Sequence, residues 1–117
     1  MSKGRHAFSG YNDEALTTTV KSISSDGDFS TKGQVFWLRG VTLTNEHATQ
    51  TGLIDLYDQD EAAATAANQR AAIQVEALTT VVVEFSAPGI PFKTELGAVA
   101  TNGTFNAYTA SCWGYLE

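Results

Sequence analysis

The sequence predicts an all-β domain, an antiparallel β-sandwich of the jelly-roll type with one short alanine-rich helical insertion. Apolar and polar residues alternate with a period of two over several short segments, as in half-buried strands. Turn dipeptides such as Asp26-Gly27 and Asn102-Gly103 separate these segments. The composition agrees, because only 17% of the residues are charged while Thr, Ser, Asn, Gln and Gly are abundant. About seven or eight short strands separated by turns are typical of a sandwich.

The chain divides into an arm and a single domain. Residues 1–14 are mostly polar or flexible and predict a flexible N-terminal arm, in which Phe8 and Tyr11 could pack on this domain or on a neighbour. Residues 15–117 predict one β-sandwich domain, because 117 residues leave no room for two. Its first strand is expected at residues 16–25, which are rich in Thr, Val and Ile.

Residues 34–45 give the clearest strand pattern. Both faces of this strand are apolar around Phe36, Trp37 and Leu38, which predicts burial on both sides or a contact between subunits. Gly40 in the same strand indicates a β-bulge or a close approach of another group to the backbone.

One helical window interrupts the strands. After a strand at residues 51–57, residues 61–72 are dominated by alanine, which has the highest intrinsic helix propensity. Asp58 or Asp60 is placed to act as the N-cap of this helix. We therefore expect a short helix or helical loop that lies across the sheet.

The second half of the chain again reads as strands. They are expected at residues 73–78, 79–86, 90–92, 96–100 and 105–116. Pro91 fits an edge strand or the start of a strand. The last two strands flank Asn102-Gly103, the strongest short-range signal for a hairpin, so we expect them to pair with each other.

Charge and apolar content narrow the range of partners. The formal net charge of −6 disfavours nucleic acid and anionic membrane surfaces as partners, and it favours a basic protein surface. No stretch resembles a signal peptide or approaches the roughly 20 apolar residues of a membrane helix. We expect a protein that is made in a cytoplasm and folds without an internal disulfide, because Cys112 is the only cysteine.

Residues able to perform catalysis are scarce. A Ser-His-Asp or Cys-His site needs a histidine that a third group holds within hydrogen-bond reach of the nucleophile. The only histidines are His6, in the arm, and His47, in a polar turn. Cys112 lies in the middle of a strand without a basic neighbour, which predicts a buried, unreactive thiol. The sequence therefore predicts no catalytic residue, no cofactor and no enzymatic activity.

Two groups of residues have alternative interpretations. Asp55, Asp58 and Asp60 are candidate Ca²⁺ ligands, but their spacing lacks the calcium-loop pattern, so capping and a solvated loop are the preferred interpretation and no metal site is predicted. Trp37 and Trp113 fit a core or a subunit interface, and alternatively a stacking platform for a sugar or another ligand, with help from Tyr108 and the acidic loop.

The region from residue 35 to residue 116 resembles the small β-domain proteins of tailed-bacteriophage particles. The likeness is carried by residues 40–45 (GVTLTN), 52–58 (GLIDLYD), 85–92 (FSAPGIPF) and 96–104 (LGAVATNGT). It implies a component of the virion, with capsid decoration (cement) proteins as the best fit in size. A tail or head fibre module is the alternative within this group.

The resemblance also implies a partner and an assembly. A decoration protein binds the outside of an assembled capsid and bridges major capsid protein subunits, often as a trimer, so this chain is expected on the capsid surface of a virion. The expected protein interface comprises five side chains, Phe8, Tyr11, Phe36, Trp37 and Leu38. The resemblance carries no catalytic residue over to this chain.

Overall fold

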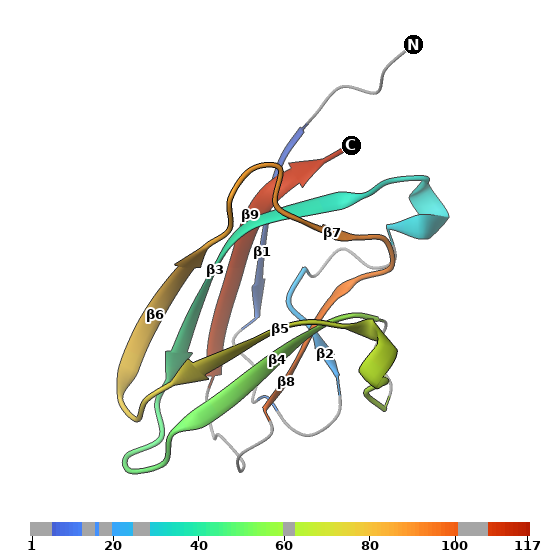
Figure 1. The fold of residues 1–117 in the computed structure, drawn as a ribbon. Helices are drawn as coiled ribbons and strands as arrows, with labels where there is room; N and C mark the ends of the chain where they lie inside the picture. The colour runs from blue at the N-terminus through green and yellow to red at the C-terminus, as the bar shows by residue number, and fades with distance from the viewer. Residues whose placement is uncertain (1–5, 13–15, 17–19, 25–28, 60–62, 101–107) are drawn as a thin grey trace.

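The computed structural model describes residues 6–12, 16, 20–24, 29–59, 63–100 and 108–117. Strands account for most of this part of the chain, and short 3-10 helices provide its helical turns (Figure 1). The elements are β1 (His6–Asn12), β2 (Lys21–Ser22), η1 (Ser30–Lys32), β3 (Phe36–Asn45), β4 (Gly52–Asp58), η2 (Ala66–Asn68), β5 (Gln69–Val75), β6 (Thr79–Glu84), β7 (Ile90–Phe92), β8 (Leu96–Ala100) and β9 (Tyr108–Leu116).

The strands form two antiparallel sheets packed face to face (Figure 1). The first sheet has the order β1-β9-β3-β6, and β7 also pairs with β3. The second sheet has the order β2-β8-β4-β5. The pairs are nested along the chain as in one long folded hairpin: β1 with β9, β2 with β8, β3 with β6 and β7, and β4 with β5. This is the jelly-roll arrangement, and the predicted antiparallel sandwich is confirmed.

The core lies between the two sheets and is apolar. Both sheets contribute fully buried side chains, among them Phe36, Leu38, Val41, Leu43, Ile54, Leu56, Val75, Ala98, Ala100 and Ala110. At one end, Phe8, Phe29 and Phe36 form an aromatic cluster with ring centroids 5.1–6.0 Å apart. Burial of aliphatic and aromatic side chains therefore holds the sheets together.

A β-bulge in β3 accounts for the apolar residues on both faces of this strand. Phe36 and Leu38 point into the core, but so do Val41 and Leu43, which strict alternation would place on the opposite face. The pairing of β3 with β9 shifts register between Leu38 and Gly40. The extra residue reverses the phase of the strand, so both apolar pairs reach the same core. The predicted bulge is confirmed.

The N-terminal segment corrects one expectation. Residues 6–12, which we expected to be part of a flexible arm, form β1 and pair with β9 from His6↔Leu116 to Asn12↔Ala110. Phe8 faces inward onto the aromatic cluster, which ties the strand to the core. The rest of the expected arm lies outside the described residues.

The alanine-rich helix is a second correction. In the described part of residues 61–72 there is only a single 3-10 turn at Ala66–Asn68, and β5 begins at Gln69. Ala71, Ile73 and Val75 alternate with exposed residues along β5, so this segment has the period of a strand. Pairing with β4 overrides a helix propensity that is marginal over so short a window.

The expected C-terminal hairpin is a third correction. β8 pairs with β4 and β2 in the second sheet, whereas β9 pairs with β3 and β1 in the first. Every residue of β8 is buried, which fits a central strand covered on both faces. The connection at residues 101–107, including Asn102-Gly103, lies outside the described residues. The chain therefore changes sheets between these strands instead of folding back on itself.

Candidate binding site on the outer face of the first sheet

An open depression of about 420 Å³ lies on the outer face of the first sheet. It is lined by Arg39, Glu84, Phe85, Ser86, Trp113 and Tyr115. Its position follows from the pairing of β3, because β6 and β7 share one side of this strand and separate at the level of the bulge. The residues that leave β6 and the bulged residue of β3 therefore frame the depression.

Arg39 links the bulge to the end of β6. Its Nε donates a hydrogen bond to the carbonyl oxygen of Phe85 (3.0 Å), and the N–H of Phe85 donates to the carbonyl oxygen of Arg39 (2.9 Å). No ion pair joins its guanidinium to any residue in the described ranges, although the exposed Glu84 lines the same depression. The Nη groups of Arg39 and the Glu84 carboxylate can thus donate to and accept from a ligand or partner.

Trp113 forms one wall because Gly40 leaves space for its indole. A Cβ at Gly40 would overlap the six-membered ring of Trp113, so only glycine permits this packing. Tyr115 follows on the same face of β9 and is 37% exposed. The rings of Trp113 and Tyr115 and a pair of opposite charges therefore meet in one depression beside Phe85, a combination that suits recognition through stacking and hydrogen bonds.

The five residues expected at a protein interface are not brought together. Phe36 and Leu38 are fully buried in the core of this chain, so the prediction that they contact a partner is wrong. Phe8 is half-buried on the same core. The side chain of Tyr11 lies outside the described part of the structure.

Trp37 is the one expected interface residue whose described side chain reaches the outer face. It pairs with Tyr115 on β9 and with Pro91 on β7. Its Nε1 is buried and has no hydrogen-bond partner in the structure. The indole is half-buried between neighbouring strands and does not line the depression.

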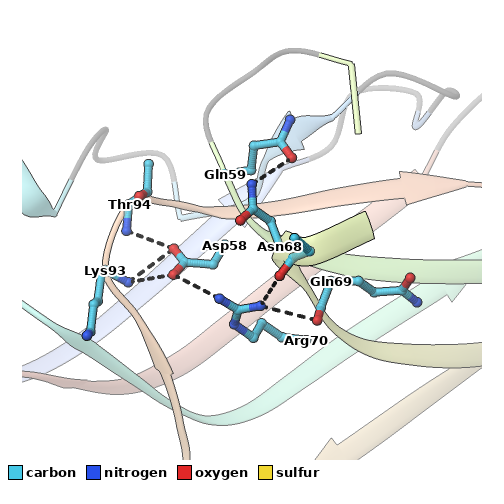
Figure 2. Close-up of polar contacts among 8 residues, drawn as sticks. Asp58, Gln59, Asn68, Gln69, Arg70, Lys93 and Thr94 are labelled. Atoms are coloured by element: carbon cyan, nitrogen blue, oxygen red, sulfur yellow. Dashed lines mark hydrogen bonds and ion pairs between the residues drawn. The ribbon is translucent and has the colours of Figure 1, made fainter. Parts of the chain in front are cut away.

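Asp58 has a structural role. Its carboxylate accepts hydrogen bonds from the backbone N–H groups of Lys93 (3.1 Å to each oxygen) and Thr94 (2.7 Å to Oδ1), as Figure 2 shows. Arg70 Nη2 lies 3.8 Å from Oδ2 and completes the surroundings. Asp58 therefore ties the turn between β7 and β8 to the end of β4.

Asp55 lies on the other face of β4, because it is three positions from Asp58 along this strand and successive side chains alternate. Burial raises the pKa of the Asp55 carboxyl. Burial, together with the charge of Asp55, also raises the pKa of Tyr57. Among the described residues no three potential ligands gather in a metal-binding group, and Asp60 lies outside them. Asp55 and Asp58 therefore do not share a cation site.

Cys112 and His47 also have structural surroundings. The Cys112 thiol is buried beside the carbonyl oxygen of Ile23, and burial raises its pKa to about 12. His47 lies in the turn between β3 and β4, where its Nδ1 accepts the N–H groups of Thr49 (3.2 Å) and Gln50 (2.9 Å). At neutral pH the thiol is protonated, as expected of an unreactive cysteine.

Comparison with known proteins adds no family. Neither a scan of protein-family models nor a search of curated proteins finds a match to this chain. In the described part of the chain, no helix is both long and apolar enough to cross a membrane.

Sequence reasoning identified Trp113 and Gly40 but missed the other residues of the depression. Glu84, Phe85 and Tyr115 looked like ordinary strand residues. The signal available was the bulge, since bulges often re-aim side chains next to functional sites. Only the pairing of β3 with both β6 and β7 shows which residues the bulge brings together.

Proposed function

We propose that this chain is a structural component of a virus particle that binds the outside of an assembled capsid and stabilises it by bridging major capsid subunits. The carrying observation is the outer face of the first sheet, where Trp113, Tyr115 and Arg39 surround an open depression. Aromatic and arginine side chains are the residues most enriched in the energetic centres of protein interfaces.

The fold and the sequence resemblance support the same proposal. Jelly rolls occur in viral capsid domains, and in lectins and cupins as well, so the fold agrees with a virion role by analogy only. The sequence resemblance to small β-domain proteins of tailed phages favours the virion. A cement protein has to bind a surface formed by several capsid subunits and does not have to catalyse a reaction. An exposed sheet face can provide such a binding surface.

The proposal is tested by binding to undecorated capsid shells. Purified chain is mixed with such shells and sedimented, and the bound amount is measured against concentration. We expect saturable binding that Tyr115→Ala weakens roughly tenfold or more, as an interface centre would. Gln74→Ala, at an exposed position on β5 in the second sheet, is the matched control and keeps full binding. Absence of saturable binding to the cognate shell overturns the proposal.

A second candidate is a sugar-binding function for the same depression. The observation that favours it is the presence of Arg39 and Glu84 beside two aromatic rings, because sugars stack on rings and exchange hydrogen bonds with charged groups. The site differs from the ligand-stacking platform that the sequence predicts. Trp113 belongs to both, but Trp37 does not line the depression, and Asp55 and Asp58 of the acidic loop lie on β4 of the second sheet. Quenching of tryptophan fluorescence by glycans, lost in Trp113→Phe, supports it. Unchanged fluorescence across a glycan panel counts against it.

A further inference from the structure

β6 is an edge strand with one side unpaired. In the first sheet it pairs only with β3, and it forms the border of the sandwich in Figure 1. The Phe85 N–H donates to Arg39 on β3, and backbone groups of successive residues point to alternate sides. The N–H and C=O groups of Thr80, Val82 and Glu84 therefore point away from β3, toward the free edge.

This edge is also the most apolar exposed part of the described surface. Leu78, in the turn before β6, is 69% exposed, and Val82 in the middle of the strand is 61% exposed. No other large apolar side chain of the described residues is as exposed. β6 (TTVVVE) also lacks proline, lysine and a bulge, the features by which proteins usually protect an edge from pairing.

The other edge strands differ from β6. β5 carries Arg70, and its outward positions hold polar residues and alanine. β2 is two residues long and β7 is three residues long with a central proline, so both are too short for extended pairing. β1, at the opposite border of the first sheet, contains Gly10 and Asn12, which are unfavourable in strands, and among its described side chains no large apolar one is exposed. Among these edges, β6 is therefore the one along which an added strand can best form backbone hydrogen bonds.

A second copy of the chain fits this edge because β6 is complementary to itself: in an antiparallel pair centred on Val82, Val82 faces Val82 and Thr80 faces Glu84. The chain carries a net charge of −6, so two copies repel except where their contact surfaces are neutral. β6 is such a surface, because Glu84 at its end is its only charged residue. Parallel pairing in register would bring the two Glu84 side chains together. Antiparallel pairing about a two-fold axis places each at the far end, near a threonine of the other copy.

We propose that two copies of this chain associate through antiparallel β6–β6 pairing, which joins their first sheets into one continuous sheet. Val82 of each copy lies near the two-fold axis, and both depressions remain on the same outer face. This pairing concerns self-association and does not rest on the virion role. The pairing produces a dimer, whereas the phage resemblance implies a trimer. A measurement of molar mass therefore distinguishes the proposed pairing from the expected trimer.

The test is the molar mass of the full chain in solution, by sedimentation equilibrium over a range of concentrations. We expect the mass to rise from the 12.5 kDa of the monomer to twice that value as concentration increases. Val82→Lys should hold the chain at monomer mass. Val82→Pro should do the same, because it removes an N–H that points to the free edge and breaks no bond to β3.

Ser111→Lys is the matched control. Ser111 lies on the same outer face, on β9, and is separated from β6 by β3. The Ser111→Lys substitution adds the same charge as Val82→Lys without blocking the edge of β6, so the dimer should persist. Circular dichroism and thermal unfolding confirm that each variant is folded. A wild type that stays at monomer mass, a trimer, or a dimer that survives both Val82 variants overturns the proposal.

Discussion

Gly40 and Trp113 occupy neighbouring strands, and the indole fills the space that a side chain at Gly40 would need. The contact lies at the bulge of β3, where the alternation of this strand changes phase. It links the packing of the first sheet to the depression, because Trp113 is one of the walls. A change at Gly40 should therefore alter stability and the site together.

We expect Gly40→Ala to destabilise the fold by about 1–3 kcal/mol, because the new methyl group forces the indole of Trp113 to move. Urea denaturation measures the loss, and tryptophan fluorescence reports the displaced ring. Thr42→Ala, two residues along the same strand on its outer face, should cost less and leave the spectrum unchanged. A stable Gly40→Ala protein with wild-type fluorescence would contradict the contact.

Asp58→Ala should lower the free energy of unfolding by about 1–3 kcal/mol, because it removes the acceptor of two backbone N–H groups in the turn between β7 and β8. Arg70→Ala should cost under about 1 kcal/mol, since that ion pair is long and partly exposed. Thermal unfolding of both variants measures the difference. Addition of Ca²⁺ should leave the Tm of the wild type unchanged, and a clear rise would restore the metal interpretation.

Asp55 should reduce stability at neutral pH. Burial raises its pKa in the folded chain above the unfolded value of 3.8. The folded state then binds more protons than the unfolded state between the two values, so stability falls as pH rises through this window. Asp55→Asn should therefore raise the free energy of unfolding at pH 7 relative to wild type.

The Asp55 effect is measured as a difference, because other carboxylates titrate in the same range. Urea denaturation of wild type and Asp55→Asn at pH 4 and pH 7 should show a stability gap that is larger at pH 7. Asp58→Asn is the matched comparison and should lower stability at pH 7, since its carboxylate is hydrogen-bonded. An Asp55→Asn protein less stable than wild type at pH 7 would show that the carboxylate has a stabilising partner.

Cys112 should make the fold sensitive to alkali. Its pKa is about 12 in the folded chain against 9.0 unfolded, so the unfolded thiol ionises first and stability falls between pH 9 and pH 12. Three pK units at about 1.4 kcal/mol each set an upper bound of about 4 kcal/mol on this loss. Cys112→Ala should show a shallower decline between pH 8 and pH 10.5 in urea denaturation. Equal slopes for the two proteins would place the thiol in contact with water.

The strands that the sequence predicted well are those in which local pattern and burial agree. On β9, Ala110, Cys112 and Leu116 are buried and alternate with outward-facing residues, as period two requires. The bulge at Gly40 was also predictable, because glycine in a strand has few other uses. Residues 69–72 form a strand and not the predicted helix, because the alternation that continues through Ile73 and the pairing with β4 outweigh the helix propensity of alanine.

The amino-acid sequence by itself determined that this chain is an all-β sandwich, because alternation and turn residues act over a few neighbouring positions. The tertiary structure alone decided that β8 and β9 belong to different sheets, that β1 joins the first sheet, and that β6 and β7 separate beside Arg39. These features depend on pairing between residues far apart in the chain. The stabilisation that such pairing brings depends on how much apolar surface the complete core buries, which no short segment of sequence specifies. The depression belongs to this second class, since its walls come from β3, β6 and β9.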